Sequence, residues 1–128
     1  MKTPKFVLAL LASALLGACA SHQTHSAAPA MMSGDMLTAS NGMTLYVFDK
    51  DAAGSGKSMC NGPCASNWPP LYVMEGAAAS GDYSVVTRDD AKKQWAFKGK
   101  PLYFWAKDMK PGDKTGDGFN NVWHVARP

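Results

Sequence analysis

The chain contains nearly the same eight-residue segment twice. The segment TLYVFDKD occupies residues 44–51, and PLYFWAKD occupies residues 101–108. Successive side chains of a strand point to opposite faces, and in both segments the side chains on both faces are apolar. Neither half of so short a chain can cover both faces of its own strand. The doubled segment therefore predicts two quasi-equivalent repeats that complete each other about a quasi-twofold axis, with Tyr46 close to Tyr103.

The remaining strand and turn signals predict a mainly β fold, a small antiparallel β domain. Further strands are expected at residues 84–88, 94–97 and 122–127, with turns at 89–93 and 98–100. One short helical turn is expected near residues 62–67, because Pro63 suits a first helical turn and the Pro-Pro pair after Trp68 prevents continuation. We place the repeat halves at about residues 36–76 and 81–128, within one domain that spans residues 36–128.

The N-terminus has the pattern of an export signal. Lys2 and Lys5 precede an apolar run that is too short to cross a bilayer, and the run ends in Leu-Gly-Ala-Cys at Cys19. This lipobox resembles that of bacterial lipoproteins, so residues 1–18 are predicted to be a signal peptide and Cys19 to carry the lipid. The predicted location is the bacterial cell envelope, with the membrane as a partner through that lipid. In a Gram-negative host, Ala20 favours the outer membrane by analogy with known sorting.

Charge and composition describe the rest of the mature protein. Removal of the signal peptide takes away two of the 13 basic residues and none of the 10 acidic ones, which lowers the formal net charge from +3 to +1. No nucleic-acid partner is therefore expected. The basic stretch between Arg88 and Lys100 is interpreted as a solvated strand-and-turn face. Residues 19–35, rich in Ala, Ser and Pro and without aromatic residues, are predicted to be a flexible tether.

The doubled segment resembles a known family. This family comprises predicted bacterial lipoproteins with a conserved Yx(FWY)xxD motif, also described as a secreted lipoprotein repeat of unknown function. The matching residues are Tyr46, Phe48 and Asp51 in one copy and Tyr103, Trp105 and Asp108 in the other. The similarity covers the chain from about residue 34 to its C-terminus. It implies export, lipidation and a paired repeat, and it implies no established activity.

Two cysteines remain after lipidation of the first. Cys60 and Cys64 lie in an exported chain, so a structural disulfide is the first interpretation. The alternative is a metal or redox pair, to which Met59 and His124 would add ligands. In the tether, imidazole and thioether side chains lie close together in sequence, and copper accepts both kinds of ligand. The candidate metal ligands are Cys60, Cys64, Met59, His124, His22 and His25.

No nucleophile and base occur at a recognisable spacing, so no catalytic residue is assigned. The leading hypothesis is an anchored, non-enzymatic binding or structural module, for which a protein of the envelope is a candidate partner. The first alternative is a periplasmic protein that handles copper or haem through Cys60 and Cys64. A thiol-disulfide oxidoreductase is the weaker alternative.

Overall fold

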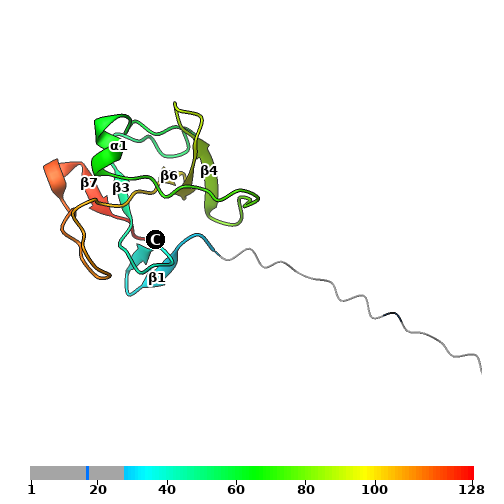
Figure 1. Ribbon diagram of the computed structural model, residues 1–128, viewed down its shortest axis with the longest axis horizontal. Helices are drawn as coiled ribbons and strands as arrows, with labels where there is room; N and C mark the ends of the chain where they lie inside the picture. The colour runs from blue at the N-terminus through cyan, green and yellow to red at the C-terminus, as the bar shows by residue number, and fades with distance from the viewer. Residues whose placement is uncertain (1–16, 18–27) are drawn as a thin grey trace, which may run out of the picture.

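The computed structural model describes residue 17 and residues 28–128 (Figure 1). The signal peptide, Cys19, His22 and His25 lie outside the described residues. In chain order the elements are β1 (Met31–Ser33), β2 (Met36–Thr38), β3 (Tyr46–Phe48), α1 (Pro63–Asn67), β4 (Tyr83–Thr87), β5 (Lys93–Phe97), β6 (Lys100–Pro101), the 3-10 helix η1 (Phe119–Asn121) and β7 (Trp123–Val125). Within these residues no helix has the length and apolar character that a membrane span requires.

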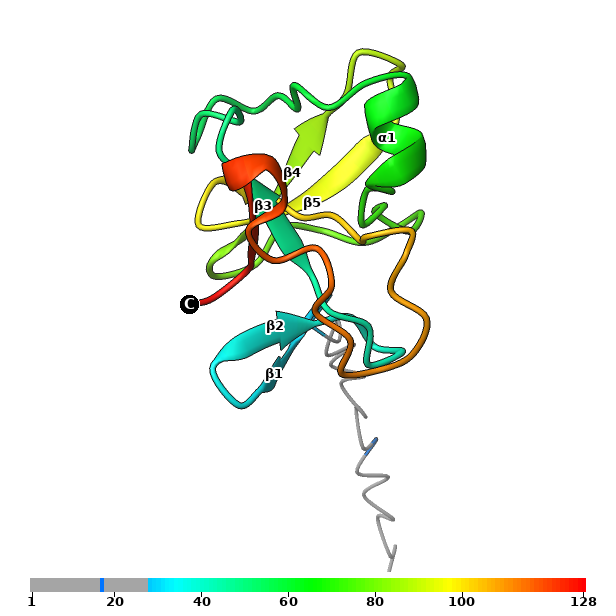
Figure 2. The same ribbon diagram turned by 90° about the vertical axis from the view of Figure 1, so that its left-hand side faces the viewer.

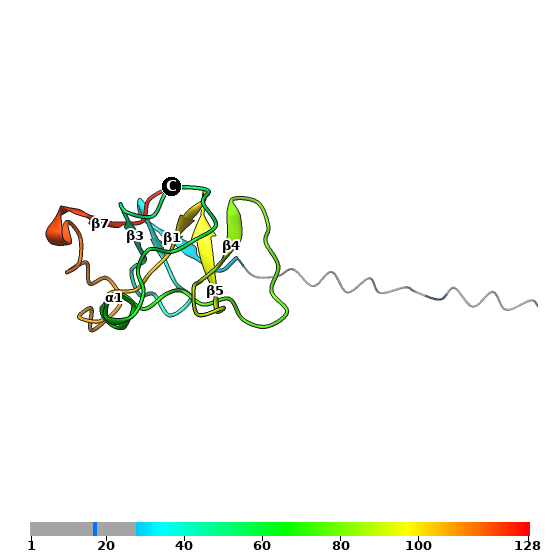
Figure 3. The same ribbon diagram turned by 90° about the horizontal axis from the view of Figure 1, so that it is seen from above.

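The strands form three small antiparallel sheets. Their orders are β1-β2, β3-β7 and β4-β5-β6. Figure 2 shows the β1-β2 hairpin at one end of the domain and the β4-β5 pair at the other, with β3 between them, and Figure 3 separates β3 and β7 from β4 and β5. The prediction of a mainly β, antiparallel domain with a single short helix is confirmed.

The two copies of the doubled segment meet at the centre of the domain. Tyr46 N–H donates to the carbonyl of Tyr103 (2.8 Å), and Tyr103 N–H donates to the carbonyl of Tyr46 (2.9 Å). This reciprocal antiparallel bridge places the two tyrosines on either side of a quasi-twofold axis. Two further hydrogen bonds repeat about it, from Leu71 N–H to the carbonyl of Leu102 (2.9 Å) and from Ala126 N–H to that of Leu45 (2.8 Å).

The second copy is less regular than its sequence predicts. Only β6 and isolated bridges form there, whereas the first copy pairs with β7 along the whole of β3. The segment opposite the second copy contains Pro69 and Pro70, which have no N–H to donate, so a continuous ladder cannot form. The final strand is also shorter than predicted, Trp123–Val125 in place of residues 122–127; at its start, Val122 is the C-cap of η1.

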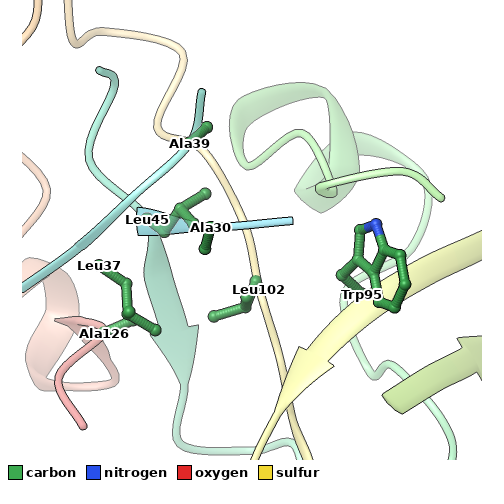
Figure 4. Close-up of a cluster of buried hydrophobic side chains, with 7 residues drawn as sticks. All are labelled: Ala30, Leu37, Ala39, Leu45, Trp95, Leu102 and Ala126. Carbon is green, nitrogen blue, oxygen red and sulfur yellow. The ribbon is translucent and has the colours of Figure 1, made fainter. Parts of the chain in front are cut away.

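The faces of the central strands are covered by two separate clusters. Leu45 and Leu102 are fully buried on one face, where Leu37 and Trp95 pack around them (Figure 4). The aromatic cluster on the other face is formed by Tyr46, Trp68, Tyr103, Trp105 and Trp123, together with Cys60 and Val125. Both faces of the doubled segment are thus removed from water, and that burial is the main stabilising contribution to so small a domain.

The N-terminal boundary of the fold differs from the predicted one. β1 lies within the segment assigned to the tether, where it pairs with β2, and Ala30 is buried in the core. Ala30 belongs to the same buried cluster as Leu37 and Leu45, and β1 pairs with one edge of β2 as β4 pairs with one edge of β5. The folded part therefore includes residues 30–35, and the predicted domain start at residue 36 is corrected.

Candidate functional site

The polar side chains of the doubled segment bond across the quasi-twofold axis. Tyr46 Oη donates to Asp108 Oδ2 (2.6 Å), and Tyr103 Oη donates to Asp51 Oδ2 (2.5 Å). The tyrosine of each copy is therefore bound to the aspartate of the other copy. Both tyrosines are fully buried, and the two carboxylates are nearly so.

The second oxygen of each aspartate holds the turn that follows its own strand. Asp51 Oδ1 accepts a hydrogen bond from Met59 N–H (2.6 Å). Asp108 Oδ1 accepts one from Thr115 N–H (3.0 Å) and another from the Thr115 hydroxyl (2.6 Å). Each carboxylate thus joins the turn of its own repeat to the tyrosine of the other repeat. These bonds stabilise the interface between the two halves.

An aromatic stack runs through the same interface. Its rings follow the order Phe48, Trp123, Trp68, Trp105, with centroid separations of 4.2, 3.8 and 4.0 Å. Each outer ring occupies the third position of the Yx(FWY)xxD motif in one copy, and each inner ring comes from the segment that pairs with that copy. Tyr46 meets Trp68 edge-on at 5.3 Å, and Tyr103 meets Trp123 edge-on at 5.1 Å. The stack therefore obeys the same symmetry as the Tyr–Asp pairs, with both geometries favourable for aromatic rings.

Arg88 breaks this symmetry. Its side chain is buried, and Nη1 donates to Ser58 Oγ (2.9 Å) and Gln94 Oε1 (2.7 Å), while Nη2 donates to the Cys60 carbonyl (2.5 Å). Because the proton of Tyr103 Oη goes to Asp51, the Ser58 hydroxyl donates to Tyr103 Oη (2.6 Å). Ser58 thereby connects the Arg88 guanidinium to the hydrogen-bonded pair of Tyr103 and Asp51. Asp108 instead binds Tyr46 and Thr115.

Burial controls the ionisation of these groups. It raises the pKa of Asp51, and the hydrogen bonds from Tyr103 and Met59 and the charge of Arg88 oppose that rise. Burial, followed by the bond to the partner carboxylate, raises the pKa of Tyr46 and of Tyr103 well above the ordinary value. Both tyrosines consequently stay protonated in the folded protein at any physiological pH.

We expect this tyrosine pair to make the domain sensitive to alkali. In the unfolded chain Tyr46 and Tyr103 ionise near pH 10, whereas their folded-state pKa values are raised, so their stabilising contribution is complete below pH 10 and is lost as the pH rises. The loss is roughly 1.4 kcal/mol per tyrosine for each pH unit above about 10. Urea unfolding between pH 8.5 and 11 measures it. A Tyr46→Phe, Tyr103→Phe variant should show a shallower slope, and an unchanged slope would contradict this account.

The two cysteines form a disulfide in the structure. Their Cα atoms lie 5.2 Å apart, and the bond closes the chain around Gly62 and the first turn of α1. Pro63 occupies the first helical turn, where its missing N–H removes no intrahelical hydrogen bond. Cys60 is fully buried and its carbonyl receives Arg88, so the bond stabilises the loop that holds the guanidinium.

The candidate metal ligands are not brought together. His124 lies on strand β7, and its Nε2 atom is 2.8 Å from Asp49 Oδ2. About half of each of these two side chains is exposed. The Met59 side chain points to solvent, while only its N–H contacts the buried network. Among residues 28–128 no group of three or more His, Cys, Asp or Glu side chains is close enough to hold a metal. The combination of Cys60, Cys64, Met59 and His124 as one site is therefore corrected.

Reduction of the disulfide should have a moderate effect on stability. A disulfide that closes so short a loop contributes about 2 kcal/mol by restricting the unfolded chain. We expect reductant, or the Cys60→Ser, Cys64→Ser variant, to lower the free energy of unfolding by about that amount without loss of the fold. Urea unfolding with and without reductant measures the difference. Reductant should not affect the double variant, which serves as the control.

Sequence reasoning missed two parts of the molecule. Arg88 was assigned to a solvated face, but its side chain is only 3% exposed. The signal in the sequence is its place two residues after Val86, which is buried, because side chains two apart in an extended segment point to the same face. The second is a surface hollow of about 240 Å³, to which β3, β7 and the turn between β5 and β6 contribute; Lys98, Lys100 and His124 lie on its wall. Residues from both repeats form it, so no local pattern could show it.

Comparison with known proteins agrees with the two-repeat architecture. Residues 31–72 and 84–127 each match the model of a lipoprotein family described as a secreted repeat of unknown function. The chain belongs to this family. The two matched segments are the two halves that meet at Tyr46 and Tyr103, so the family repeat is one half of the domain seen here. No curated protein and no solved structure matches the chain at a significant level.

Proposed function

We propose that this secreted repeat protein is a lipid-anchored, non-enzymatic binding or structural module of the bacterial cell envelope. In a Gram-negative host it would be carried by the outer membrane. The membrane is its partner through the lipid on Cys19, and an envelope protein is a further candidate partner. The domain itself then acts as a rigid body held at a membrane surface.

A single observation carries the non-enzymatic part of the proposal. The tyrosine and the aspartate of the motif point into the domain in both copies, and these four side chains are bonded to one another or to backbone N–H groups. Tyr46 and Tyr103 have no exposed surface, so neither hydroxyl can reach a substrate. A Tyr–Asp pair in an open cleft would suit acid-base chemistry. In this domain the same pair joins two half-domains, which leaves binding to the outer surface.

Lipidation is tested in cells that express the full-length chain. We expect the protein to incorporate a radiolabelled or clickable fatty acid and to fractionate with membranes. The Cys19→Ala variant should lose the label and appear in the soluble envelope fraction. Wild-type protein that is exported without label, or that loses the signal peptide at another residue, would contradict the anchor.

The copper and haem alternative requires a separate test, because it concerns the domain and not the anchor. Protein purified without an affinity tag is analysed for metal and for haem absorbance, with and without reductant. We expect no stoichiometric metal and an intact disulfide. Copper that is bound in the wild type and lost in the Cys60→Ser, Cys64→Ser variant would overturn the purely structural role of the pair.

A further inference from the structure

The surface hollow beside β3 and β7 has a chemical character of its own. Its lining combines apolar side chains with basic ones and one carboxylate. The apolar residues are Val47, Phe97, Val125 and Ala126, the basic ones are Lys98, Lys100, His124 and Arg127, and the carboxylate is that of Asp49. Its volume of about 240 Å³ is somewhat below the roughly 300–1,000 Å³ of pockets for drug-sized ligands. The hollow therefore suits a molecule smaller than a drug-sized ligand.

The charges in the hollow are unevenly compensated. His124 lies against Asp49 at 2.8 Å, and Arg127 Nε lies 3.2 Å from Asp35 Oδ2. Lys98 and Lys100 take part in no ion pair in the part of the chain that the structure describes. Two exposed ammonium groups thus stand next to apolar side chains without a carboxylate partner.

The quasi-twofold axis provides an internal comparison for this surface. A Cβ atom on Gly42 would lie 3.0 Å from Pro111, and one on Gly99 would lie 2.6 Å from the backbone nitrogen of Gly54. Pro111 and Gly54 hold corresponding places in the turns after the two doubled segments. Gly42 and Gly99 are therefore equivalent positions, each pressed against the turn of the other repeat.

The residues around these glycines show that the fold does not require the lysines. Lys98 and Lys100 flank Gly99, whereas Asn41 and Met43 flank Gly42. The close glycine contact thus forms in one repeat with two neighbouring cations and in the other with none. The two turns differ in backbone conformation, since φ is positive at Lys98 and not at Asn41.

The charged pair on the other wall shows the same contrast. Asp49 N–H donates to the carbonyl of Val122 (2.8 Å), and at the equivalent place Ala106 N–H donates to that of Asn67 (2.9 Å). Asp49 and His124 are thus matched by Ala106 and Pro69, which carry no charge. At these positions, charged residues therefore occur on only one of the two faces related by the quasi-twofold axis.

The backbone at Lys98 supports a role beyond structure. Lys98 and Gly99 form the two-residue turn between β5 and β6, and both have positive φ, 48° and 80°. Such a turn favours Asn, Asp or Gly at its first position, because other side chains are strained there. A lysine in this place is unfavourable for folding, which is a common property of residues that serve a binding site.

We infer that this hollow is a binding site for a small organic oxyanion, whose phosphate or carboxylate group is held by Lys98 and Lys100. The apolar part of the ligand lies on Val47 and Phe97, and His124 closes the opposite wall. The mature chain is close to neutral overall, so the selectivity comes from this local pair of ammonium groups. The inference deepens the binding role proposed above and does not depend on the lipid anchor.

The test uses the whole mature chain with the Cys19→Ala substitution, which reaches a membrane only through its protein surface. Phenyl phosphate, inorganic phosphate and benzyl alcohol are titrated while amide chemical shifts are followed by NMR. We expect saturable shifts at Lys98, Lys100 and His124 with phenyl phosphate, weaker binding of inorganic phosphate and none of benzyl alcohol. The Lys98→Asn, Lys100→Gln variant should bind phenyl phosphate about tenfold more weakly or worse.

The variant is chosen so that misfolding cannot explain its loss of binding. Asn accepts positive φ better than Lys, so the melting temperature of the variant should be unchanged or higher. The Lys107→Gln, Lys110→Gln variant removes the same charge from another exposed loop and should bind as the wild type does. Equal weakening in both double variants, or binding that neither variant affects, would overturn the site.

Vesicles distinguish a free ligand from a lipid headgroup. The same chain is sedimented with phosphatidylglycerol vesicles and with phosphatidylcholine vesicles. Lysine-dependent binding to the anionic vesicles, without saturation by phenyl phosphate, assigns the site to a headgroup phosphate. Saturation by phenyl phosphate without sedimentation assigns it to a soluble anion. Absence of both would refute the inference.

Discussion

Replacement of Trp68 by alanine is expected to lower the free energy of unfolding by about 3–5 kcal/mol, the largest effect of any single substitution in this domain. Trp68 stacks on Trp123 at 3.8 Å and on Trp105 at 4.0 Å, and it also meets Tyr46 edge-on. Its removal leaves a cavity between the two repeats that rigid neighbours cannot fill. A small domain has only about 5–15 kcal/mol of stability, so the variant should lose a large part of it and unfold at a much lower urea concentration than the wild type.

Urea unfolding followed by circular dichroism measures this change. Phe119→Ala is a suitable control, because Phe119 contacts the edge of the same stack but is 39% exposed. Trp68→Phe keeps a ring in the stack and should have an intermediate effect. A Trp68→Ala variant that unfolds within about 1 kcal/mol of the wild type would show that the stack does not hold the repeats together.

The substitution Asp51→Ala is expected to lower the free energy of unfolding by about 2–4 kcal/mol. It removes the acceptor of the Tyr103 hydroxyl and of Met59 N–H, and it removes the buried carboxylate with which the charge of Arg88 interacts. Asp108→Ala should be less harmful, because no arginine is linked to that carboxylate within the described residues. The neutral isostere Asp51→Asn should also be milder, since it keeps an acceptor and burial already disfavours the carboxylate charge.

A double-mutant cycle isolates the bond that joins the repeats. Tyr103→Phe is combined with Asp51→Ala, and the four stabilities are compared by urea unfolding. We expect the effects to be strongly non-additive, because both substitutions break the same hydrogen bond. Additive effects would show that the reciprocal Tyr–Asp exchange contributes little, and equal losses for Asp51→Ala and Asp108→Ala would show that Arg88 is not coupled to the first pair.

The contacts between the two repeats explain why the doubled segment contains tyrosine, aspartate and a further aromatic residue. The tyrosine hydroxyl is buried in the interface and needs an acceptor, which the aspartate of the other repeat supplies. The aspartate in turn needs donors, which the tyrosine and the backbone of its own turn supply. The aromatic residue at the third position of the motif, Phe48 or Trp105, forms one end of the stack in each copy. The tyrosine and the aspartate of the motif therefore each bind a residue of the opposite repeat, and the aromatic residue stacks on a ring of the segment that pairs with it.

Several features of the protein were determined by the sequence alone. The doubled segment carries apolar side chains on both faces, which indicates extended segments covered on both sides, and clusters of buried side chains cover both faces in the structure. Pro63 and the prolines after Trp68 limit the helix to α1. These are local properties, because backbone freedom and the period of apolar residues depend on neighbours in the chain. The repeat likewise predicted that Tyr46 and Tyr103 lie close together.

Only the tertiary structure decided which side chains of the two halves bond to each other. That Tyr46 binds Asp108 and not the aspartate of its own segment depends on the direction in which the strands cross. The burial of Arg88 depends on Ser58 and Cys60, which are distant in the chain. The hollow with Lys98, Lys100 and His124 exists because β7 pairs with β3. Two repeats of similar sequence acquire different neighbours when they pack in one domain. Contacts between distant parts of the chain leave no periodic pattern in the local sequence, so they cannot be predicted from it.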